Sequence, residues 1–241
     1  MKYLNELKSM VKGEIREKEM MSKHTYYGIG GPAEAYIIPK DKNDLCELLR
    51  FANKNSIPTY FMGSGSNLLI SDEGIKGLVI SPGKGFRALK FNRSSVYAES
   101  GIMLGRIVKE SIKRNLSGLE SLIGVPGTLG GALVMNAGAF GREISNYLYS
   151  VYVMDMKGNI ISYIPEDLDF AYRFSSFKKN EFILSAKFIL KPEHPKIIQE
   201  KKDNANIGRK TNQPLKFRSA GSVFKNPENF AAGYLIDKVG L

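Results

Sequence analysis

The sequence contains one cysteine, two histidines and no tryptophan in 241 residues. A single thiol excludes a disulfide within the chain, and its place in the leucine-rich segment Leu45–Leu49 favours a buried packing role for Cys46 over a catalytic one. His24 and His194 are too few and too isolated to form a metal-binding cluster. We therefore expect a fold without disulfides and without a metal site.

Long apolar runs are also missing. No uninterrupted stretch approaches the ~20 residues that a membrane span needs. The first 23 residues are charged and amphipathic, which predicts a helix and lacks the apolar core of a signal peptide. Hydrophobic residues nevertheless make up 43% of the chain, enough for one large domain or two to three small ones. The sequence predicts a globular, cytoplasmic protein.

Acidic residues are outnumbered, because 35 Lys and Arg against 24 Asp and Glu give a formal net charge of +11. Such a field attracts polyanions, so a basic module that binds nucleotides or nucleic acid without catalysis remains an alternative. The basic residues are scattered, however, and no DNA- or RNA-binding motif is visible. An anionic small-molecule ligand accounts for the charge equally well, and we predict no nucleic-acid partner.

Glycine, in contrast, is concentrated in the segment Leu119–Gly141, with six glycines at positions 124, 127, 130, 131, 138 and 141. Glycine costs backbone entropy, which is tolerated where the backbone needs positive φ or another molecule approaches it closely. Thr128 can cap a short helix through Met135, and free N–H groups around Gly127–Gly131 would bind a phosphate or diphosphate. A packing turn without a ligand is the alternative.

A second glycine-rich loop, Gly63–Asn67, lies between a predicted strand at Pro58–Met62 and a predicted return into the core at Leu68–Ile70. Its successive N–H groups can form a nest for a diphosphate, and its serine and asparagine side chains add donors. The third glycine of Gly-x-Gly-x-x-Gly and the Gly-Lys-Ser/Thr ending of a P-loop are both absent. Neither of those nucleotide-binding folds is indicated.

Other local patterns predict secondary structure. Asp41 is placed to cap a helix that carries leucines on one face, and Tyr149–Ile164 has the alternation of a hairpin. Glu181–Leu190 predicts a further strand, Lys196–Lys210 a charged helix, and Gln213–Arg218 a loop.

Five motifs occur along the chain: Thr25–Ala33, Gly63–Ile70, Gly124–Gly141, Tyr172-Arg173 and Gly221–Pro227. Together they resemble the UDP-N-acetylenolpyruvoylglucosamine reductase family, in the order seen there and over nearly the whole chain. The resemblance implies an α+β protein, with two subdomains of the vanillyl-alcohol-oxidase (PCMH) type of FAD-binding fold and an α/β substrate-binding domain. It implies FAD as cofactor and NADPH as reductant.

The implied reaction reduces UDP-N-acetylglucosamine enolpyruvate to UDP-N-acetylmuramate, a step of peptidoglycan precursor synthesis. The resemblance assigns noncovalent FAD binding to the two glycine-rich segments. The residues concerned are Gly63, Ser64, Gly65, Ser66, Asn67, Leu68, Gly124, Val125, Pro126, Gly127, Gly130, Gly131, Asn136, Ala137 and Gly138.

Hydride addition to the outer vinyl carbon of that substrate leaves negative charge on the neighbouring carbon and its carboxylate, so a fixed cation and a proton donor are needed. Arg173 aligns with the family's catalytic arginine, although alone it reads as a surface arginine in a loop. Ser222 aligns with the proton-donating serine, although a lone serine is usually a turn residue. Tyr172, Lys225 and Asn226 are expected at the substrate, with a surface lysine and a turn-capping asparagine as alternatives for the last two.

The expected division is residues 1–81 and 82–190 for the two FAD-binding subdomains and residues 191–241 for an incomplete substrate-binding domain. Relatives of this kind continue beyond Leu241, so the chain resembles a C-terminally truncated form of the shorter class of the family. No counterpart of the family's third catalytic group, a glutamate, is visible, and Glu228 is assigned no role. Another flavin oxidase or dehydrogenase of the same fold remains an alternative, although His24 and Cys46 lie in no flavin-attachment motif.

Overall fold

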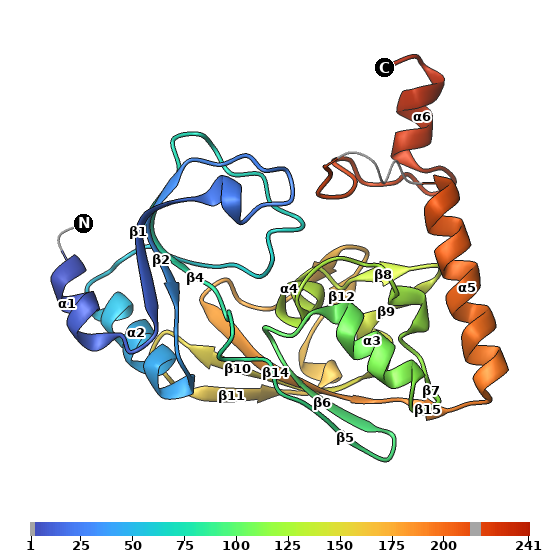
Figure 1. Ribbon diagram of the computed structural model, residues 1–241, viewed down its shortest axis with the longest axis horizontal. Coiled ribbons are helices and arrows are strands. Elements are labelled where there is room, and N and C mark those ends of the chain that lie inside the picture. Colours follow the sequence, from blue (N-terminus) through green and yellow to red (C-terminus); the bar gives the residue numbers. More distant parts are fainter. Residues whose placement is uncertain (1–2, 213–217) are drawn as a thin grey trace.

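The computed structural model describes residues 3–212 and 218–241, and two β-sheets organise it (Figure 1). The first sheet has the strand order β1-β2-β4-β3. In it β1 is antiparallel to β2, whereas β2 and β3 both run parallel to β4. The strands are β1 (Glu14–Met20), β2 (Pro32–Ile38), β3 (Thr59–Phe61) and β4 (Ile75–Ile80).

Helix α2 (Lys42–Lys54) connects β2 to β3 and buries its leucines on the first sheet, beside the short helix α1 (Leu4–Met10). The carboxylate of Asp41 accepts hydrogen bonds from the backbone N–H groups of Asn43 and Asp44, at 2.9 and 3.0 Å. This is the N-cap that the sequence predicts, and such caps stabilise a helix by about 1 kcal/mol.

The second sheet is antiparallel, with the order β11-β10-β14-β6-β5. The predicted hairpin and the predicted strand after it are both confirmed. Helices α3 and α4 pack against this sheet around the larger apolar core (Figure 1). The elements are β5 (Leu89–Asn92), β6 (Ser95–Glu99), α3 (Leu104–Ile112), α4 (Leu129–Val134), β10 (Leu148–Asp155), β11 (Ile160–Tyr163) and β14 (Glu181–Ile189).

Short elements complete the structure of the described residues. Three two-residue strand pairs are β7 (Leu116–Ser117) with β15 (Lys191–Pro192), β8 (Gly138–Ala139) with β9 (Arg142–Glu143), and β12 (Phe170–Ala171) with β13 (Phe174–Ser175). The 3₁₀ turns are η1 (Met21–Lys23), η2 (Glu120–Leu122), η3 (Ile144–Tyr147) and η4 (Pro165–Asp167).

Helix α5 (Pro195–Asn212) confirms the predicted charged helix and packs along η2 and α3, burying Ile198 and Ala205 (Figure 1). Helix α6 (Ala232–Lys238) follows near the C-terminus. The predicted loop at residues 213–218 lies outside the described residues except for Arg218. No helix in the described ranges combines the length and the apolar character that crossing a membrane requires.

One local prediction is wrong, and another is met only in part. The first 23 residues are not one helix, because α1 ends at Met10 and Glu14–Met20 forms an edge strand. This strand is charged on both faces and is held by its pairing with β2, a composition that edge strands tolerate. The predicted return of Leu68–Ile70 into the core is met only by Ile70, which is buried, whereas Leu69 is 73% exposed.

Candidate functional site

The two glycine-rich loops meet in the structure. The Gly63–Asn67 loop follows β3, and the other loop leads into α4. A Cβ atom at Gly63 would lie 2.4 Å from Thr128 Oγ1, so only glycine fits against the N-cap of α4. The Ser66 hydroxyl donates to the carbonyl oxygen of Pro126 at 3.3 Å. The folded chain thus places two segments 60 residues apart in sequence side by side.

The backbone N–H groups of these loops are used differently. In the described residues, no acceptor pairs with the N–H groups of residues 63–67, so these donors are free, as a nest for a diphosphate requires. At α4, however, the N–H groups of Leu129 and Gly130 donate to the carbonyls of Ile102 and Ser100, at 2.8 and 2.9 Å. The expected row of free donors over Gly127–Gly131 is therefore wrong at these two positions.

The remaining residues of the second segment differ in exposure. Gly124 and Pro126 are exposed, Gly127 is buried with φ +129°, and Val125 packs against the larger core. Gly131 is exposed, and a Cβ atom there would contact only Thr128 Oγ1, at 3.7 Å.

Asn136 and Ala137 are buried, so they lie behind the loop surface rather than on it. The amide nitrogen of Asn136 donates to Glu143 Oε2 at 2.7 Å and to the carbonyl of Ala171 at 3.1 Å. Its amide oxygen is buried without a partner. Asn67 and Leu68, in contrast, are exposed.

A cavity of about 600 Å³ opens next to the loop Gly63–Asn67. Its wall includes Gly63, Ser64 and Thr128, together with polar side chains from β1, η1 and β2. The Ser64 hydroxyl is buried and has no hydrogen-bond partner. Leaving a buried hydroxyl unpaired costs about 1–3 kcal/mol, so a ligand group that completes it would be favoured.

Sequence reasoning missed most of this cavity wall. Arg16, His24 and Tyr36 line it from the first sheet and η1, and Lys84 and Arg87 line it from the segment after β4. The only signal of Arg16, Lys84 and Arg87 in the sequence is the positive charge of segments that would otherwise be interpreted as solvent-exposed. The positive side chains at the cavity suit an anionic ligand.

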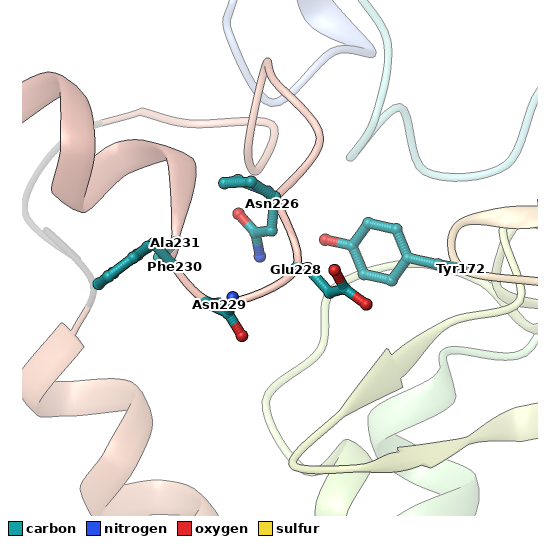
Figure 2. Close-up of a pocket in the computed structure, with 7 residues that line it drawn as sticks. Tyr172, Asn226, Glu228, Asn229, Phe230 and Ala231 are labelled. Atoms are coloured by element: carbon teal, nitrogen blue, oxygen red, sulfur yellow. The ribbon is translucent and has the colours of Figure 1, made fainter.

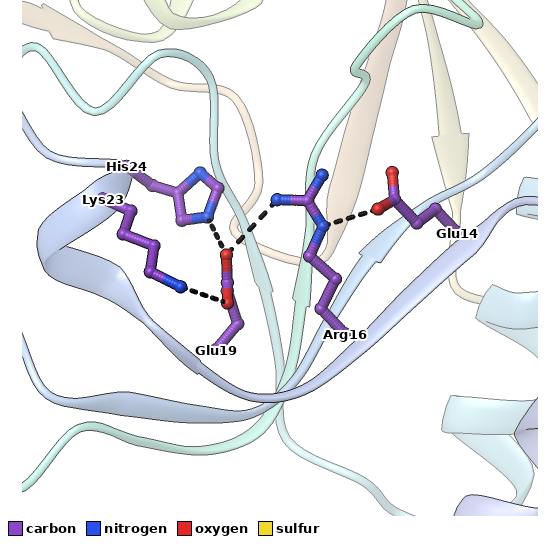
Figure 3. A network of polar contacts seen from close by, with 5 residues as sticks. All are labelled: Glu14, Arg16, Glu19, Lys23 and His24. Carbon is purple, nitrogen blue, oxygen red and sulfur yellow. Dashed lines mark hydrogen bonds and ion pairs between the residues drawn. The ribbon is translucent and has the colours of Figure 1, made fainter.

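Glu19 is the centre of a polar network beside this cavity (Figure 3). Its carboxylate accepts from His24 Nε2 at 3.0 Å, Lys23 Nζ at 3.2 Å and Arg16 Nη1 at 3.3 Å. These donors, His24 foremost, lower the pKa of Glu19 to about 2. A hydrogen bond from Arg16 Nε, at 2.6 Å, likewise lowers the pKa of Glu14. The network fixes Arg16 and His24 at the cavity wall.

The imidazole of His24 also stacks on the ring of Tyr36, with centroids 4.2 Å apart and an interplanar angle of 22°. Burial raises the pKa of the Tyr36 hydroxyl. The stacked pair gives the cavity a flat aromatic edge between its charged groups.

This network predicts an acid-sensitive contribution to stability. The folded-state pKa of Glu19 lies below its ordinary value of 4.5, so its contribution is complete above about pH 4.5 and is lost as the pH falls through about 2. Glu19→Gln is expected to lower the free energy of unfolding by about 1 to 2 kcal/mol at pH 7, after allowance for solvent screening. Urea unfolding at pH 7 and pH 3 measures this difference.

Glu17→Gln is the matched control, since Glu17 lies on the same strand and forms an exposed ion pair with Lys8. Glu17→Gln should lower the free energy of unfolding by less than about 1 kcal/mol. If Glu19→Gln lowered the free energy of unfolding by as much at pH 3 as at pH 7, the effect would not have an ionic origin.

Arg173 occupies the turn between β12 and β13 with φ +57°. Its Nη2 donates to the carbonyl of Gly138 at 3.0 Å, and its guanidinium lies 4.9 Å from the ring centroid of Tyr172. The structure therefore places the predicted cation beside the end of the second glycine-rich segment.

The motif Gly221–Pro227 contributes to a second cavity, of about 450 Å³ (Figure 2). Tyr172 lines it across from residues 226–231, so two predicted substrate residues, Tyr172 and Asn226, come together. The amide oxygen of Asn226 accepts from the N–H of Ala232 at 3.0 Å, which is the turn-capping role of the alternative interpretation. Ser222 and Lys225 are exposed and line neither cavity.

Comparison with known proteins defines the class first. Residues 33–163 match the FAD binding domain family. A solvent-stable cholesterol oxidase has TM-score 0.58 and 16% identity over 75% of this chain and 38% of its own, a likeness that shows the fold alone. The chain has the α+β FAD-binding fold of the vanillyl-alcohol-oxidase (PCMH) type, as the sequence predicts.

Two more similar proteins narrow the class. The UDP-N-acetylenolpyruvoylglucosamine reductase of Clostridioides difficile (strain 630) is 41% identical over 240 residues, 99% of this chain and 79% of that protein. The crystal structure of the Thermus caldophilus enzyme of that name (MurB) has TM-score 0.82 and 33% identity, covering 95% of this chain and 80% of its own. The chain belongs to the UDP-N-acetylenolpyruvoylglucosamine reductase family.

Proposed function

We propose that this protein is an FAD-dependent reductase that converts UDP-N-acetylglucosamine enolpyruvate to UDP-N-acetylmuramate with NADPH as reductant. Family membership supports the reaction. Three features that lie together support FAD as the cofactor. The N–H groups of residues 63–67 are free, the buried Ser64 hydroxyl has no hydrogen-bond partner, and the cavity beside them is lined by positive side chains. A dinucleotide diphosphate satisfies all three features.

In this proposal the loop Gly63–Asn67 holds the diphosphate of FAD, and the cavity beside it takes the adenosine half. Arg16, Lys84 and Arg87 then offset the phosphate charge. The His24–Tyr36 pair offers a flat face on which a purine can stack. The contact residues of the second segment, Gly124 to Gly138, stay a prediction.

FAD, when bound, supplies the hydride chemistry, and the residues of the chain position the substrate and manage charge. Arg173 binds the substrate carboxylate and stabilises the charge that develops beside the reacting carbon. The Ser222 hydroxyl donates the proton. Gly221, with φ +87° and open space at its Cβ position, gives the exposed serine the freedom to reach the substrate.

Tyr172, Lys225 and Asn226 hold the sugar nucleotide in this proposal. The cavity that Tyr172 and Asn226 share supports a substrate position on the same side as Arg173. Residues 1–81 and 82–190 act as the FAD-binding subdomains and residues 191–241 as the substrate-binding part. A cytoplasmic location stays a prediction.

The absorbance spectrum of the purified protein tests the proposal directly. We expect a yellow protein that releases flavin on denaturation and is bleached by NADPH, with the colour restored by the enolpyruvate substrate. Flavin retained after denaturation would favour another oxidase of the fold. A colourless protein that binds no added FAD would refute the proposal and favour the basic binding module.

A further inference from the structure

Arg209, near the end of α5, is a partly buried cation without an anionic partner. Its Nη1 donates to the carbonyl of Gly124 at 3.1 Å, and a Cβ atom at Gly124 would lie 3.2 Å from its Nε. That Nε is buried and has no hydrogen-bond partner. In residues 3–212 and 218–241, no carboxylate forms an ion pair with this guanidinium, and burial lowers its pKa. An uncompensated charge of this kind is costly to keep.

Helix α5 has other contacts that hold it on the protein, so its packing does not require the contact of Arg209 with Gly124. Lys201, on the same helix, already lies 3.5 Å from the buried carboxylate of Glu120 and donates to Ser117 Oγ at 3.1 Å. Buried Ile198 and Ala205 add apolar contact. The unsatisfied Nε of Arg209 and its charge, which no carboxylate of the described residues offsets, therefore favour binding of a ligand.

The contacts around Arg209 indicate which part of the bound cofactor it would face. A Cβ atom at Gly208 would lie 2.6 Å from the ring of Phe140, in the turn between β8 and β9. Gly138, at the start of that hairpin, accepts the hydrogen bond from Arg173. Arg209 thus borders the same hairpin as the proposed catalytic cation.

The diphosphate loop contacts Pro126 and Thr128 instead. Arg209 therefore lies where the second segment borders the hairpin that Arg173 contacts, and its contacts differ from those of the loop Gly63–Asn67.

We propose that Arg209 binds the pyrimidine edge of the isoalloxazine ring, at N1 and the C2 carbonyl, and tunes the flavin toward reduction. This inference rests on the proposed function. NADPH transfers a hydride, two electrons and one proton, to N5 and leaves as NADP⁺. The ring gains one negative charge, located mainly at N1 and the C2 oxygen. A fixed guanidinium at that edge stabilises the reduced form relative to the oxidised form.

The test compares three variants of the flavin-loaded protein by reduction potential, FAD affinity and thermal unfolding. Arg209→Met removes the charge at similar length, and Arg209→Lys keeps it. Lys201→Met is the matched control, because it removes an α5 cation that is already paired. We expect Arg209→Met to lower the equilibrium constant for two-electron reduction about tenfold, which is about 30 mV for this couple. Arg209→Lys should recover most of this, and Lys201→Met should leave the potential unchanged.

Sulfite offers a second readout, since its addition to N5 places the same negative charge on the ring. Arg209→Met should weaken sulfite binding about as much as it lowers the reduction constant. An unchanged potential and sulfite affinity, with only a lower unfolding temperature, would make Arg209 a structural clamp and overturn the inference.

Loss of FAD binding in folded Arg209→Met, with binding retained in Arg209→Lys, would assign the cation to the diphosphate and also overturn the inference. Both outcomes leave the proposed function intact. A wild-type protein that binds no FAD contradicts the proposed function itself.

Discussion

Replacing Ser222 with alanine is expected to separate the two half-reactions. Bleaching of the flavin by NADPH needs no proton donor at the substrate carbon, so its rate should stay close to that of the wild type. Reoxidation by the enolpyruvate substrate should slow by roughly 10²–10⁴, the usual contribution of a positioned general acid. Stopped-flow absorbance with each substrate alone measures both rates.

Ser219→Ala is the control for this experiment. Ser219 lies three residues earlier in the same exposed segment, where its hydroxyl accepts from the N–H of Gly221 at 3.2 Å. Its loss should leave both half-reactions within a small factor of the wild type. If Ser222→Ala slowed both half-reactions equally, Ser222 would be a structural residue of the turn.

Replacing Gly65 with valine is expected to abolish flavin binding. Gly65 has φ +66°, and a Cβ atom there would lie 2.0 Å from the carbonyl oxygen of His24. The side chain must therefore displace either the η1 turn or the loop whose N–H groups we assign to the diphosphate. Flavin content after purification and titration of the apoprotein with FAD measure the loss.

Because that substitution also strains the fold, Gly131→Ala supplies the sharper comparison. Gly131 is exposed and its Cβ position is open on the protein side, so alanine should favour α4 by about 1 kcal/mol. A tenfold or greater loss of FAD affinity in this variant can then come only from the approaching cofactor. Gly233→Ala on α6 makes the same change where the Cβ also has open space. Unchanged affinity in Gly131→Ala would remove that residue from the cofactor site.

Strong local patterns account for what could be predicted. Asp41 satisfies two N–H groups of its own helix, and the hairpin Tyr149–Ile164 alternates regularly, so neither depends on distant residues. The two glycine-rich loops were also identified, because close backbone approach restricts the residue type.

Features that depend on distant partners were missed. Glu14–Met20 shows no apolar alternation, and only its pairing with β2 makes it a strand. The donors of Leu129 and Gly130 looked free in the sequence because their acceptors, Ile102 and Ser100, lie about thirty residues away. Arg209 reads as one more charge on a solvated helix until α5 is placed against Gly124.

The contact between Gly63 and Thr128 links cofactor binding to the integrity of the whole molecule. Gly63 lies in the loop that follows β3 of the first sheet, and Thr128 caps a helix that packs on the second sheet. A ligand held by both loops binds the folded chain only, so it stabilises that chain by an amount that grows with ligand concentration. A destabilising substitution in either apolar core, far from any flavin atom, would then appear first as a paler protein whose colour returns with added FAD.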